Sequence, residues 1–408
     1  MAAKPSPVDN PLKGLVPYSS QGGRERFPHS MIFSYFSVAE VWVTSDQFDW
    51  SPVEVFLEKA RSEGRQGVLR FWLEYPGKES GVPKHLREAG VRVTEWKHGT
   101  KVIFTPDYES EVLKAGLQKF IKNFGEKYDN DARLGYVTAG LLGQWGEWHG
   151  WPRSDLYASA AVEKLVLEAF AKSFKKTPVA LRYPAREGHG SHADNAAFEN
   201  FGYHDDSFGW ATLHTGKKDQ GWFFETLLKA AGAEDRWKTQ PIGGEVRPEI
   251  WGTVFTDQPH AKEQDFETCV ERVKLSWAMD SGLFAKRFAL SETRRARAEK
   301  AVRKMGYDLR VRSWRFRNGK LVLEVGNDGV APFYREWMVV GEFGGESVAL
   351  DWDVTEVMPG EVVTWEVAVP EKAKQFRFRV PNVMKGGRPL RFGNKDDVEG
   401  WVAISLGE

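Results

Sequence analysis

Short apolar segments alternate with amphipathic helical patterns over about the first 300 residues of the chain. The apolar segments share a length and composition typical of buried strands, and seven are predicted: Met31–Val38, Gly67–Tyr75, Leu134–Gly140, Pro178–Tyr183, Phe201–Asp205, Pro241–Glu245 and Leu275–Met279. Helical periodicity separates several of them, most clearly over Ser51–Gly64, Tyr108–Lys127 and Ser154–Lys175. Strands that alternate with helices in this way predict an α/β protein with a parallel sheet.

Two parallel architectures fit this alternation, a closed (β/α)8-like TIM barrel and an open doubly wound sheet. The turn after the first strand lacks Gly-x-Gly-x-x-Gly, which argues against a dinucleotide-binding open sheet. Polar residues follow one predicted strand after another, and barrel enzymes build their active sites from such strand ends. We therefore predict a TIM barrel over residues 1–305, with a turn-rich arm at residues 1–30. Val91–Trp96 is either its eighth strand or a strand in an insertion.

The hydrophobic period changes to two near Gly306, after an Arg- and Lys-rich helix. Leu309–Arg317 and Lys320–Val325 flank Asn318-Gly319, which is a type I′ hairpin signal. Alternating segments continue to the C-terminus and give about seven short strands in about 100 residues. This pattern predicts an antiparallel β-sandwich over residues 306–408. We expect its role to be mainly structural, with most of its tryptophans facing inward.

Composition excludes several classes of partner. Lys and Arg number 57, as do Asp and Glu, so no net charge attracts nucleic acid or an anionic membrane. No apolar run is long enough to cross a bilayer, and the single Cys269 has no partner for an intramolecular disulfide. The start, Met1–Pro7, lacks the apolar core of a signal peptide. We expect a secreted or periplasmic protein, and whether a signal peptide has been removed stays open. Its oligomeric state stays open.

The strongest chemical signal is the segment Gly140-Leu-Leu-Gly-Gln-Trp-Gly-Glu-Trp-His-Gly-Trp151, which follows a predicted buried strand. Glu147 stands between Trp145 and Trp148, an apolar setting that raises the pKa of a carboxyl group, as a general acid requires. The alternative is a tight structural loop with packed tryptophans and an exposed glutamate. Loops at strand ends carry catalysis in barrels, which favours the functional interpretation.

A second carboxylate follows another predicted strand in Pro241-Ile-Gly-Gly-Glu-Val-Arg-Pro248. Glu245 would face Glu147 across the barrel mouth. Cleavage of a glycosidic bond needs two such acids, one to protonate the leaving oxygen and one to attack or to activate water. The structural alternative for Glu245 is an ion pair with Arg70, Arg182 or Arg247.

The other candidate substrate-binding residues share a position in or just after a predicted strand: Arg70, Glu74, Trp145, Trp148, His149, Arg182, Tyr183, His204, Asp205, Arg247 and Trp251. A buried arginine is costly unless it is paired, so we expect Arg70 and Arg182 to orient the carboxylates. The histidines and aspartates match no zinc-ligand spacing. We therefore predict that the protein needs neither a metal nor another cofactor.

Three segments carry a resemblance to a known family: Asn10-Pro-Leu-Lys-Gly-Leu15, Gly143-Gln-Trp-Gly-Glu-Trp-His149 and Gly243-Gly-Glu245. Over nearly its whole length the chain resembles uncharacterised bacterial proteins with a DUF4832 domain, often after a DUF4874-type segment. The resemblance implies a barrel glycoside hydrolase. The arrangement is also similar to the retaining clan whose acid/base Glu follows strand four and whose nucleophile ends strand seven, which implies these roles for Glu147 and Glu245. Gly146 stands where that clan usually has Asn.

Three functional classes remain open, and all three take a carbohydrate as partner. The first is a glycoside hydrolase, whose activity is detected by the new reducing ends that it releases. The second is a polysaccharide lyase on the same scaffold, in which arginines neutralise a uronate and Tyr183 or His204 acts as the base. The third is a glycan-binding protein without activity. The 17 tryptophans suit each of them, because apolar faces of sugar rings pack on indoles.

Overall fold

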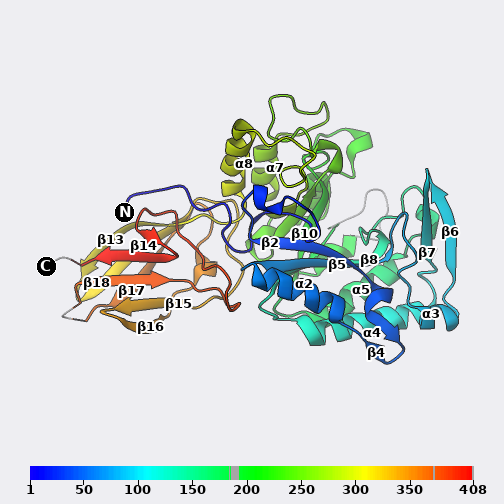
Figure 1. Ribbon diagram of the computed structural model, residues 1–408, viewed down its shortest axis with the longest axis horizontal. Coiled ribbons are helices and arrows are strands. Elements are labelled where there is room, and N and C mark those ends of the chain that lie inside the picture. The colour runs from blue at the N-terminus through cyan, green and yellow to red at the C-terminus, as the bar shows by residue number, and fades with distance from the viewer. Residues whose placement is uncertain (183, 185–192, 371–372, 407–408) are drawn as a thin grey trace.

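The computed structural model describes residues 1–182, 184, 193–370 and 373–406 (Figure 1). Eight parallel strands form one sheet in the order β1-β12-β11-β10-β9-β8-β5-β2. Their bounds are β1 Gly14–Val16, β2 Met31–Ser37, β5 Gln66–Glu74, β8 Leu134–Gln144, β9 Val179–Leu181, β10 Phe201–Phe208, β11 Ile242–Val246 and β12 Leu275–Met279. From β2 onward each strand pairs with the next barrel strand in chain order, and the last strand, β12, pairs with β1.

The sheet is nearly closed by the segment that follows β1. Tyr18 forms a parallel bridge to Phe33 of β2. The Phe33 amide donates to the carbonyl of Pro17 at 2.9 Å, and the Ser19 amide donates to the Phe33 carbonyl at 2.8 Å. The predicted TIM barrel is therefore confirmed. In chain order around it, β8 is the fourth strand and β11 the seventh.

The eighth barrel strand lies in the segment expected to be an arm. β1 has only three residues, between Gly14 with a φ of 87° and Pro17, so turn residues hide it. Val91–Trp96 is not a barrel strand. Its residues from Val93 onward form β6 (Val93–His98), which pairs with β7 (Lys101–Pro106) as a hairpin inserted after β5. The second of the two alternatives for this segment is thus confirmed.

Helices cover the barrel in the predicted places. The main ones are α2 Ser51–Ser62, α4 Glu111–Tyr128, α5 Ala160–Ser173, α6 Phe224–Ala230, α7 Phe266–Val273 and α8 Glu292–Lys304. α4 shows why the pattern works: Ser110 caps its first turn, and Leu113, Leu117, Phe120 and Phe124 bury one face at helical spacing. None of the described helices is both long and apolar enough to cross a membrane.

The C-terminal region contains two antiparallel sheets, which confirms the predicted sandwich. One sheet has the order β13-β14-β17 and the other β16-β15-β18-β20-β19. Their strands are β13 Leu309–Arg317, β14 Lys320–Asn327, β15 Val339–Phe343, β16 Glu346–Leu350, β17 Val362–Ala368, β18 Gln375–Arg379, β19 Asp397–Val398 and β20 Trp401–Ser405. Trp365 is buried, as expected, whereas Trp314 on the edge strand β13 is 38% exposed.

The sandwich packs against the amino-terminal ends of the barrel strands (Figure 1). Arg335 donates to the carbonyl of Leu134 at 3.0 Å, and Gln66 donates to Asn382 at 3.2 Å. Leu134 and Gln66 are the first residues of β8 and β5. Buried side chains inside this end of the barrel belong to one cluster with the sandwich core. The opposite end, where the strands finish, is left free for a binding site.

Candidate active site

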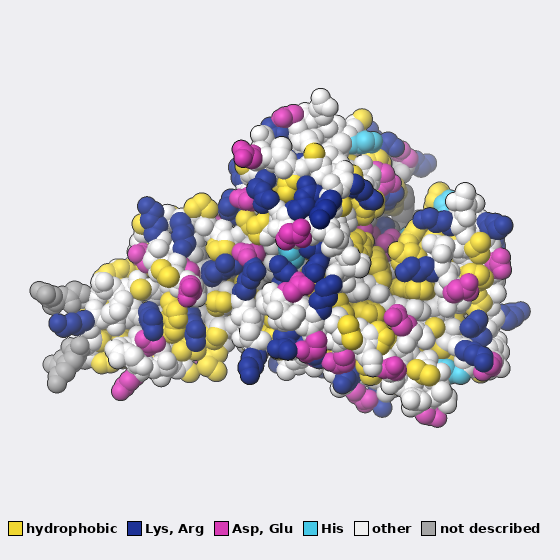
Figure 2. All heavy atoms as spheres, in the orientation of Figure 1, with side chains coloured by type: hydrophobic (Ala, Val, Ile, Leu, Met, Phe, Trp, Pro, Cys, Tyr) yellow, Lys and Arg dark blue, Asp and Glu magenta, His cyan; other side chains and the backbone are white. Residues whose placement is uncertain are grey.

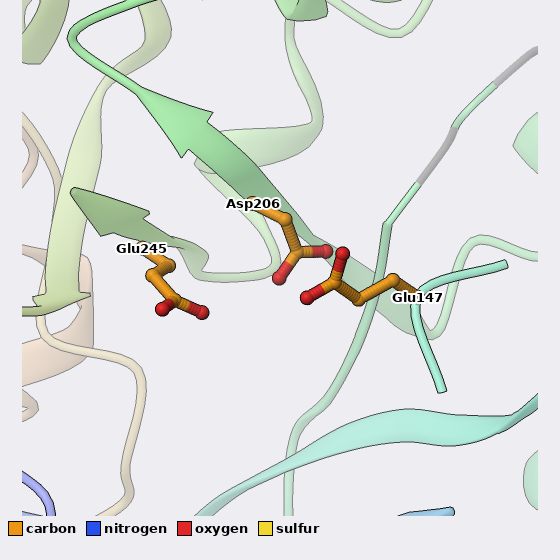
Figure 3. Close-up of side chains that lie close together, drawn as sticks. All are labelled: Glu147, Asp206 and Glu245. Carbon is orange, nitrogen blue, oxygen red and sulfur yellow. The ribbon is translucent and has the colours of Figure 1, made fainter. Parts of the chain in front are cut away.

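Three carboxyl groups meet at the carboxyl ends of the barrel strands (Figure 3). Glu147 comes from the loop after β8, Asp206 from β10 and Glu245 from β11. One oxygen of each lies within 4.8 Å of one oxygen of the other two. Parallel strands of a barrel converge at this end, which is why residues about 100 apart in the chain reach the same point.

The loop that carries Glu147 folds back over the end of β8. Gly143 and Gly146 have φ angles of 76° and 70°, which glycine adopts without strain. A Cβ at Gly143 would lie 2.4 Å from the His149 carbonyl oxygen, so the two sides of the loop approach too closely for a side chain. The Trp148 indole donates to the carbonyl oxygens of Ala139 and, at 3.2 Å, Gly140. These contacts aim Glu147, which is 15% exposed, toward the barrel axis.

Two buried arginines hold Glu147 and Asp206. Arg182 Nη1 lies 2.7 Å from Glu147 Oε2 and 3.4 Å from Asp206 Oδ2. Arg70 Nη2 lies 2.8 Å from Asp206 Oδ1, and its Nη1 lies 3.5 Å from Glu147 Oε1. Thr138 on the neighbouring strand β8 fixes the Arg70 guanidinium by accepting from its Nε at 2.9 Å. The arginines therefore orient carboxylates, and the two they reach are Glu147 and Asp206.

Glu245 has a different environment. Its Oε1 accepts a hydrogen bond of 3.0 Å from the Tyr18 hydroxyl. Burial, followed by the nearby charges of Glu147 and Asp206, raises the pKa of Glu245 to about 8, although Arg70 and the Tyr18 hydrogen bond oppose the shift. At neutral pH Glu245 therefore carries a proton in the free protein.

This charge distribution is the reverse of the one expected from the sequence. We expected tryptophans to keep Glu147 protonated and an arginine to keep Glu245 ionised. Trp148 is instead buried in the core, and Arg182 pairs with Glu147. The arginines form ion pairs with Glu147 and Asp206, whereas burial raises the pKa of Glu245 to about 8, so Glu245 is the protonated member of the cluster at neutral pH.

Asp206 is the functional residue that the sequence reasoning did not select. Burial alone would raise the pKa of Asp206, but Arg70, His204 and Arg182 together hold it well below its usual range. His204 Nδ1 lies 3.1 Å from Asp206 Oδ1, so both side chains point into the barrel. Side chains alternate along a strand, so selecting His204 implies selecting Asp206 and excluding Asp205.

Asp205 points away from the three carboxyl groups. It accepts hydrogen bonds from the Thr212 hydroxyl at 2.6 Å and the Ser207 amide at 2.9 Å. Burial raises its pKa to about 7. Its contacts shape the loop after β10, and Asp205 also lines a small cavity with Arg182, His204 and Asp206, so its role in substrate binding stays a prediction.

The buried side chains of Glu74 and Trp148 have structural roles. Glu74 accepts hydrogen bonds from Thr105 of the β6–β7 hairpin at 2.5 Å and from Tyr108 at 2.9 Å, and burial raises its pKa to about 7. Trp148 is 1% exposed and packs in the barrel's outer core. Neither side chain reaches a substrate at the mouth, because each is enclosed by protein.

The remaining candidates divide by position. His149 Nε2 lies 3.4 Å from Glu147 Oε2, and its ring is 6.1 Å from the Trp145 ring. Both are partly exposed at the mouth, and burial lowers the pKa of His149. Arg247 pairs with Glu249 at 2.8 Å and Trp251 donates to the Val246 carbonyl at 2.8 Å, so both are occupied by local contacts. Tyr183 lies outside the described residues.

Three tyrosines complete the mouth. The Tyr18 and Tyr35 rings stack with centroids 6.1 Å apart, and Tyr75 stands edge-on to Tyr35 at 5.8 Å. The Tyr35 hydroxyl accepts from Arg70 at 3.4 Å. These rings surround the carboxyl groups with partly exposed aromatic faces. Tyr18 escaped the sequence reasoning because it belongs to the segment interpreted as an arm.

The three carboxyl groups also present an oxygen set of the kind that binds a divalent cation. Arg70 and Arg182 already neutralise two of them, and Glu245 holds a proton at neutral pH. A cation would have to displace that proton and compete with both guanidinium groups. The residues present therefore fit ion pairs better than a metal centre.

Comparison with known proteins gives a likeness to solved structures and nothing closer. No family model matches the chain, and no curated protein matches it. GH5_18 from Bifidobacterium longum subsp. longum ATCC 55813 is 14% identical with a TM-score of 0.43, covering 66% of this chain and 69% of its own. Endoglucanase Cel5A of Pseudomonas stutzeri is 12% identical with a TM-score of 0.41, covering 72% and 97%.

A third structure is a putative alpha-N-acetylgalactosaminidase from Bacillus halodurans C-125. It is 10% identical with a TM-score of 0.36 and covers 90% of this chain and 97% of its own. Likeness at this level says nothing about a substrate. The function is therefore argued from the geometry of the site itself.

Proposed function

We propose that this protein is a glycoside hydrolase in which Glu147 and Glu245 act as the catalytic pair. The observation that carries the proposal is the placement of these two carboxyl groups at the ends of the fourth and seventh barrel strands, with oxygens within 4.8 Å and unequal protonation. A glycosidase needs one carboxylic acid and one carboxylate on either side of the scissile bond. Here burial keeps Glu245 protonated, and Arg182 forms an ion pair with Glu147.

The roles follow from these charges. Glu245 enters the reaction protonated and donates its proton to the leaving oxygen. Glu147, ion-paired with Arg182, attacks the anomeric carbon or activates water. This assignment exchanges the roles that the family resemblance implies, because the arginines lie on the other member of the pair. After proton donation Glu245 is a carboxylate that can take a proton back from water.

The separation of the pair supports retention of configuration. Retaining enzymes hold their carboxyl groups about 5–5.5 Å apart, whereas inverting enzymes leave about 6.5–9.5 Å for a water molecule. Oxygens within 4.8 Å fit the shorter class. Proton NMR of the first product formed tests this point, and an initial anomer opposite to that of the substrate would contradict it.

A lyase is less well supported by the site. Such an enzyme needs arginine charge available for a uronate carboxylate, but Arg70 and Arg182 are already paired with Asp206 and Glu147. The two mechanisms leave different products. A lyase forms unsaturated uronates that absorb in the ultraviolet, and a hydrolase forms only new reducing ends.

The test is to assay the protein and three variants on a panel of polysaccharides and aryl glycosides, following both signals. Glu147→Gln and Glu245→Gln should each lose at least about 10²–10⁴-fold in turnover with the fold retained. Glu271→Gln, a half-exposed position on α7, is the control and should match the wild type. With an activated aryl glycoside, loss of the acid is tolerated better than loss of the nucleophile. Glu245→Gln should therefore keep more activity on that substrate than Glu147→Gln.

Wild-type protein that releases unsaturated uronates and no other product would replace the hydrolase by the lyase. Glycan binding without any product would replace it by the binding protein. A Glu147→Gln variant with more than half of wild-type turnover on a poor leaving group would remove Glu147 from the pair.

A further inference from the structure

Trp151 is an exposed aromatic side chain close to the proposed catalytic pair. It is 66% exposed, the highest fraction of any large aromatic residue in the described part of the chain. Its ring stands edge-on to the imidazole of His98 on β6, with centroids 5.0 Å apart. His98 in turn stacks on Trp96 of the same strand at 6.4 Å and 19°. We call Trp151, His98 and Trp96 the aromatic platform.

The platform is tied to the barrel on both sides. Gln144, the last residue of β8, donates from Nε2 to the Trp151 carbonyl at 2.5 Å. On the hairpin side, Trp96 donates to the Thr105 hydroxyl at 2.9 Å, and Thr105 donates to Glu74 at the end of β5 at 2.5 Å. Hydrogen bonds thus hold the Trp151 backbone and the Trp96 indole to two barrel strands, so a ligand would meet a partly pre-formed surface.

The platform continues the aromatic lining of the mouth. Trp151 follows Glu147 by four residues, so their Cα atoms are at most about 14 Å apart. At the mouth, the Tyr75, Trp145 and His149 rings form a series with centroid separations of 6.3 and 6.1 Å, and His149 precedes Trp151 by two residues in the chain. Figure 2 shows hydrophobic side chains gathered along the hollow between the lobe of α7 and α8 and the lobe of β6 and β7.

The small exposed area of the aromatic platform favours a small flat ligand over a protein partner. A protein partner needs about 800 Å² on each side, and contiguous apolar patches that bind proteins measure several hundred Å². The other large apolar side chains that are exposed among the described residues lie on other elements, such as Val43, Val55 and Val383. The Trp151 indole and the His98 imidazole together present about the area of a single sugar ring, whose CH groups pack on an aromatic face.

We propose that the aromatic platform is an accessory subsite that binds a neutral sugar ring of the substrate chain, one or more units away from the bond that is cleaved. The inference rests on the proposed function for the identity of the chain. It implies that the substrate is an oligosaccharide or polysaccharide rather than a simple monoglycoside. The binding energy comes from a part of the substrate remote from the chemistry, so it favours long chains over short ones.

The experiment compares Trp151→Ala, Trp151→Phe and the wild type on cello-, manno- and xylo-oligosaccharides of increasing length and on aryl monoglycosides. For the long substrate that the wild type accepts, Trp151→Ala should lower kcat/KM about two- to tenfold, mainly through KM, as expected for one aromatic contact. Trp151→Phe, which keeps a flat face, should recover part of the loss. Activity on aryl monoglycosides should not change. Val55→Ala, at a 70% exposed position on α2, is the control.

Binding of the same oligosaccharides to each protein, measured by calorimetry, separates the two proposals. Glycan binding that Trp151→Ala weakens, in a protein without hydrolytic activity, would support the platform and reject the hydrolase. Hydrolysis with identical chain-length dependence in the wild type and Trp151→Ala would reject the platform alone. The wild type could also prove to be a dimer that Trp151→Ala dissociates, with glycan binding unchanged. That result would assign this face to contact between two copies of the chain and would reject the platform as a sugar subsite.

Discussion

Arg182 donates a hydrogen bond of 2.7 Å to Glu147 and none to Glu245, although the two carboxyl groups have oxygens within 4.8 Å of each other. Burial, followed by the charges of Glu147 and Asp206, raises the pKa of Glu245 to about 8 and keeps the proton there. Glu147 is compensated by a guanidinium, and Glu245 is compensated by protonation, with Tyr18 donating to it. Two glutamates that look equivalent in the sequence thereby acquire different environments.

The first prediction concerns the pH dependence of hydrolysis. Because Glu245 must hold a proton in the free enzyme to act as the acid, kcat/KM on a substrate with a poor leaving group should fall as the pH rises through about 8. An activated aryl glycoside, which needs little protonation, should show a weaker fall. A kcat/KM that increases across this range would show that the ionised form of Glu245 is the active one.

Asp206→Asn should shift this fall in kcat/KM to lower pH. The Asp206 charge helps to raise the pKa of Glu245, and its removal also leaves Arg70 and Arg182 with less compensation. Both effects favour ionised Glu245, so the fall in kcat/KM should begin at a lower pH than in the wild type. If the role of Asp206 were only structural, the variant would lose activity but kcat/KM would fall at the same pH as in the wild type.

The same variant should unfold more easily. Removing one partner from a buried ion pair leaves an uncompensated charge and costs about 3–5 kcal/mol. Asp206 is buried, and it contacts Arg70, Arg182 and His204. Denaturant unfolding at pH 7 measures this loss, and the pH profile is then determined at a temperature where the variant is folded.

Trp145 and Trp148 flank Glu147 and should respond in opposite ways to substitution. Trp148→Ala removes a buried side chain and should cost about 3–5 kcal/mol of unfolding free energy. Trp145→Ala removes a partly exposed ring at the mouth and should raise KM about two- to tenfold with little change in stability. Thermal unfolding measures the stability of both variants, and steady-state kinetics measures their KM. Equal stability losses would place Trp145 in the core as well.

How far the sequence predicts this site depends on the kind of residue. β8, which precedes Glu147, has 11 buried residues and β11, which carries Glu245, has five, so both strands and the barrel could be predicted from the alternation of buried strands with helices. β1 could not, because the three residues Gly14–Val16 before Pro17 show no period and become a strand only through pairing with β12. Tyr18 was missed for the same reason.

The choice among neighbouring polar residues needed the direction of each side chain. His204 and Asp206 point inward and Asp205 outward, which alternation along β10 could have indicated. The partner of Arg182 could not be inferred. It depends on the path of the loop after β8, which Gly143 and Gly146 bend over the mouth with positive φ angles.

Activity should not depend on a divalent metal. The oxygens of Glu147, Asp206 and Glu245 are close enough to share a cation, but two guanidinium groups and one proton already balance their charges. Dialysis against EDTA should leave the rate of hydrolysis unchanged. A loss of activity that calcium or magnesium restores would make this cluster a metal centre and would displace Arg70 and Arg182 from their assigned role.

The last prediction uses the buried Glu74, which lies outside the catalytic pair. Burial raises its pKa from 4.5 to about 7, so between these values the folded protein holds a proton that the unfolded chain releases. Stability is therefore fully present below pH 4.5 and is lost as the pH rises toward 7, by about 3 kcal/mol for a shift of this size. Asp205 and Glu245, whose pKa values are also raised, add to the same slope.

Glu74→Gln imitates the protonated acid and should remove its share of this loss. Its amide can still accept from Tyr108 and can donate to Thr105, so the connection between the hairpin and the barrel persists. At pH 5 the variant and the wild type should have similar unfolding free energies, and at pH 8 the variant should be the more stable of the two. Glu346→Gln, at an exposed position on β16, should follow the wild type at both values. Parallel pH dependence in the wild type and Glu74→Gln, measured by chemical denaturation, would show that Glu74 is ionised in the folded protein across this range.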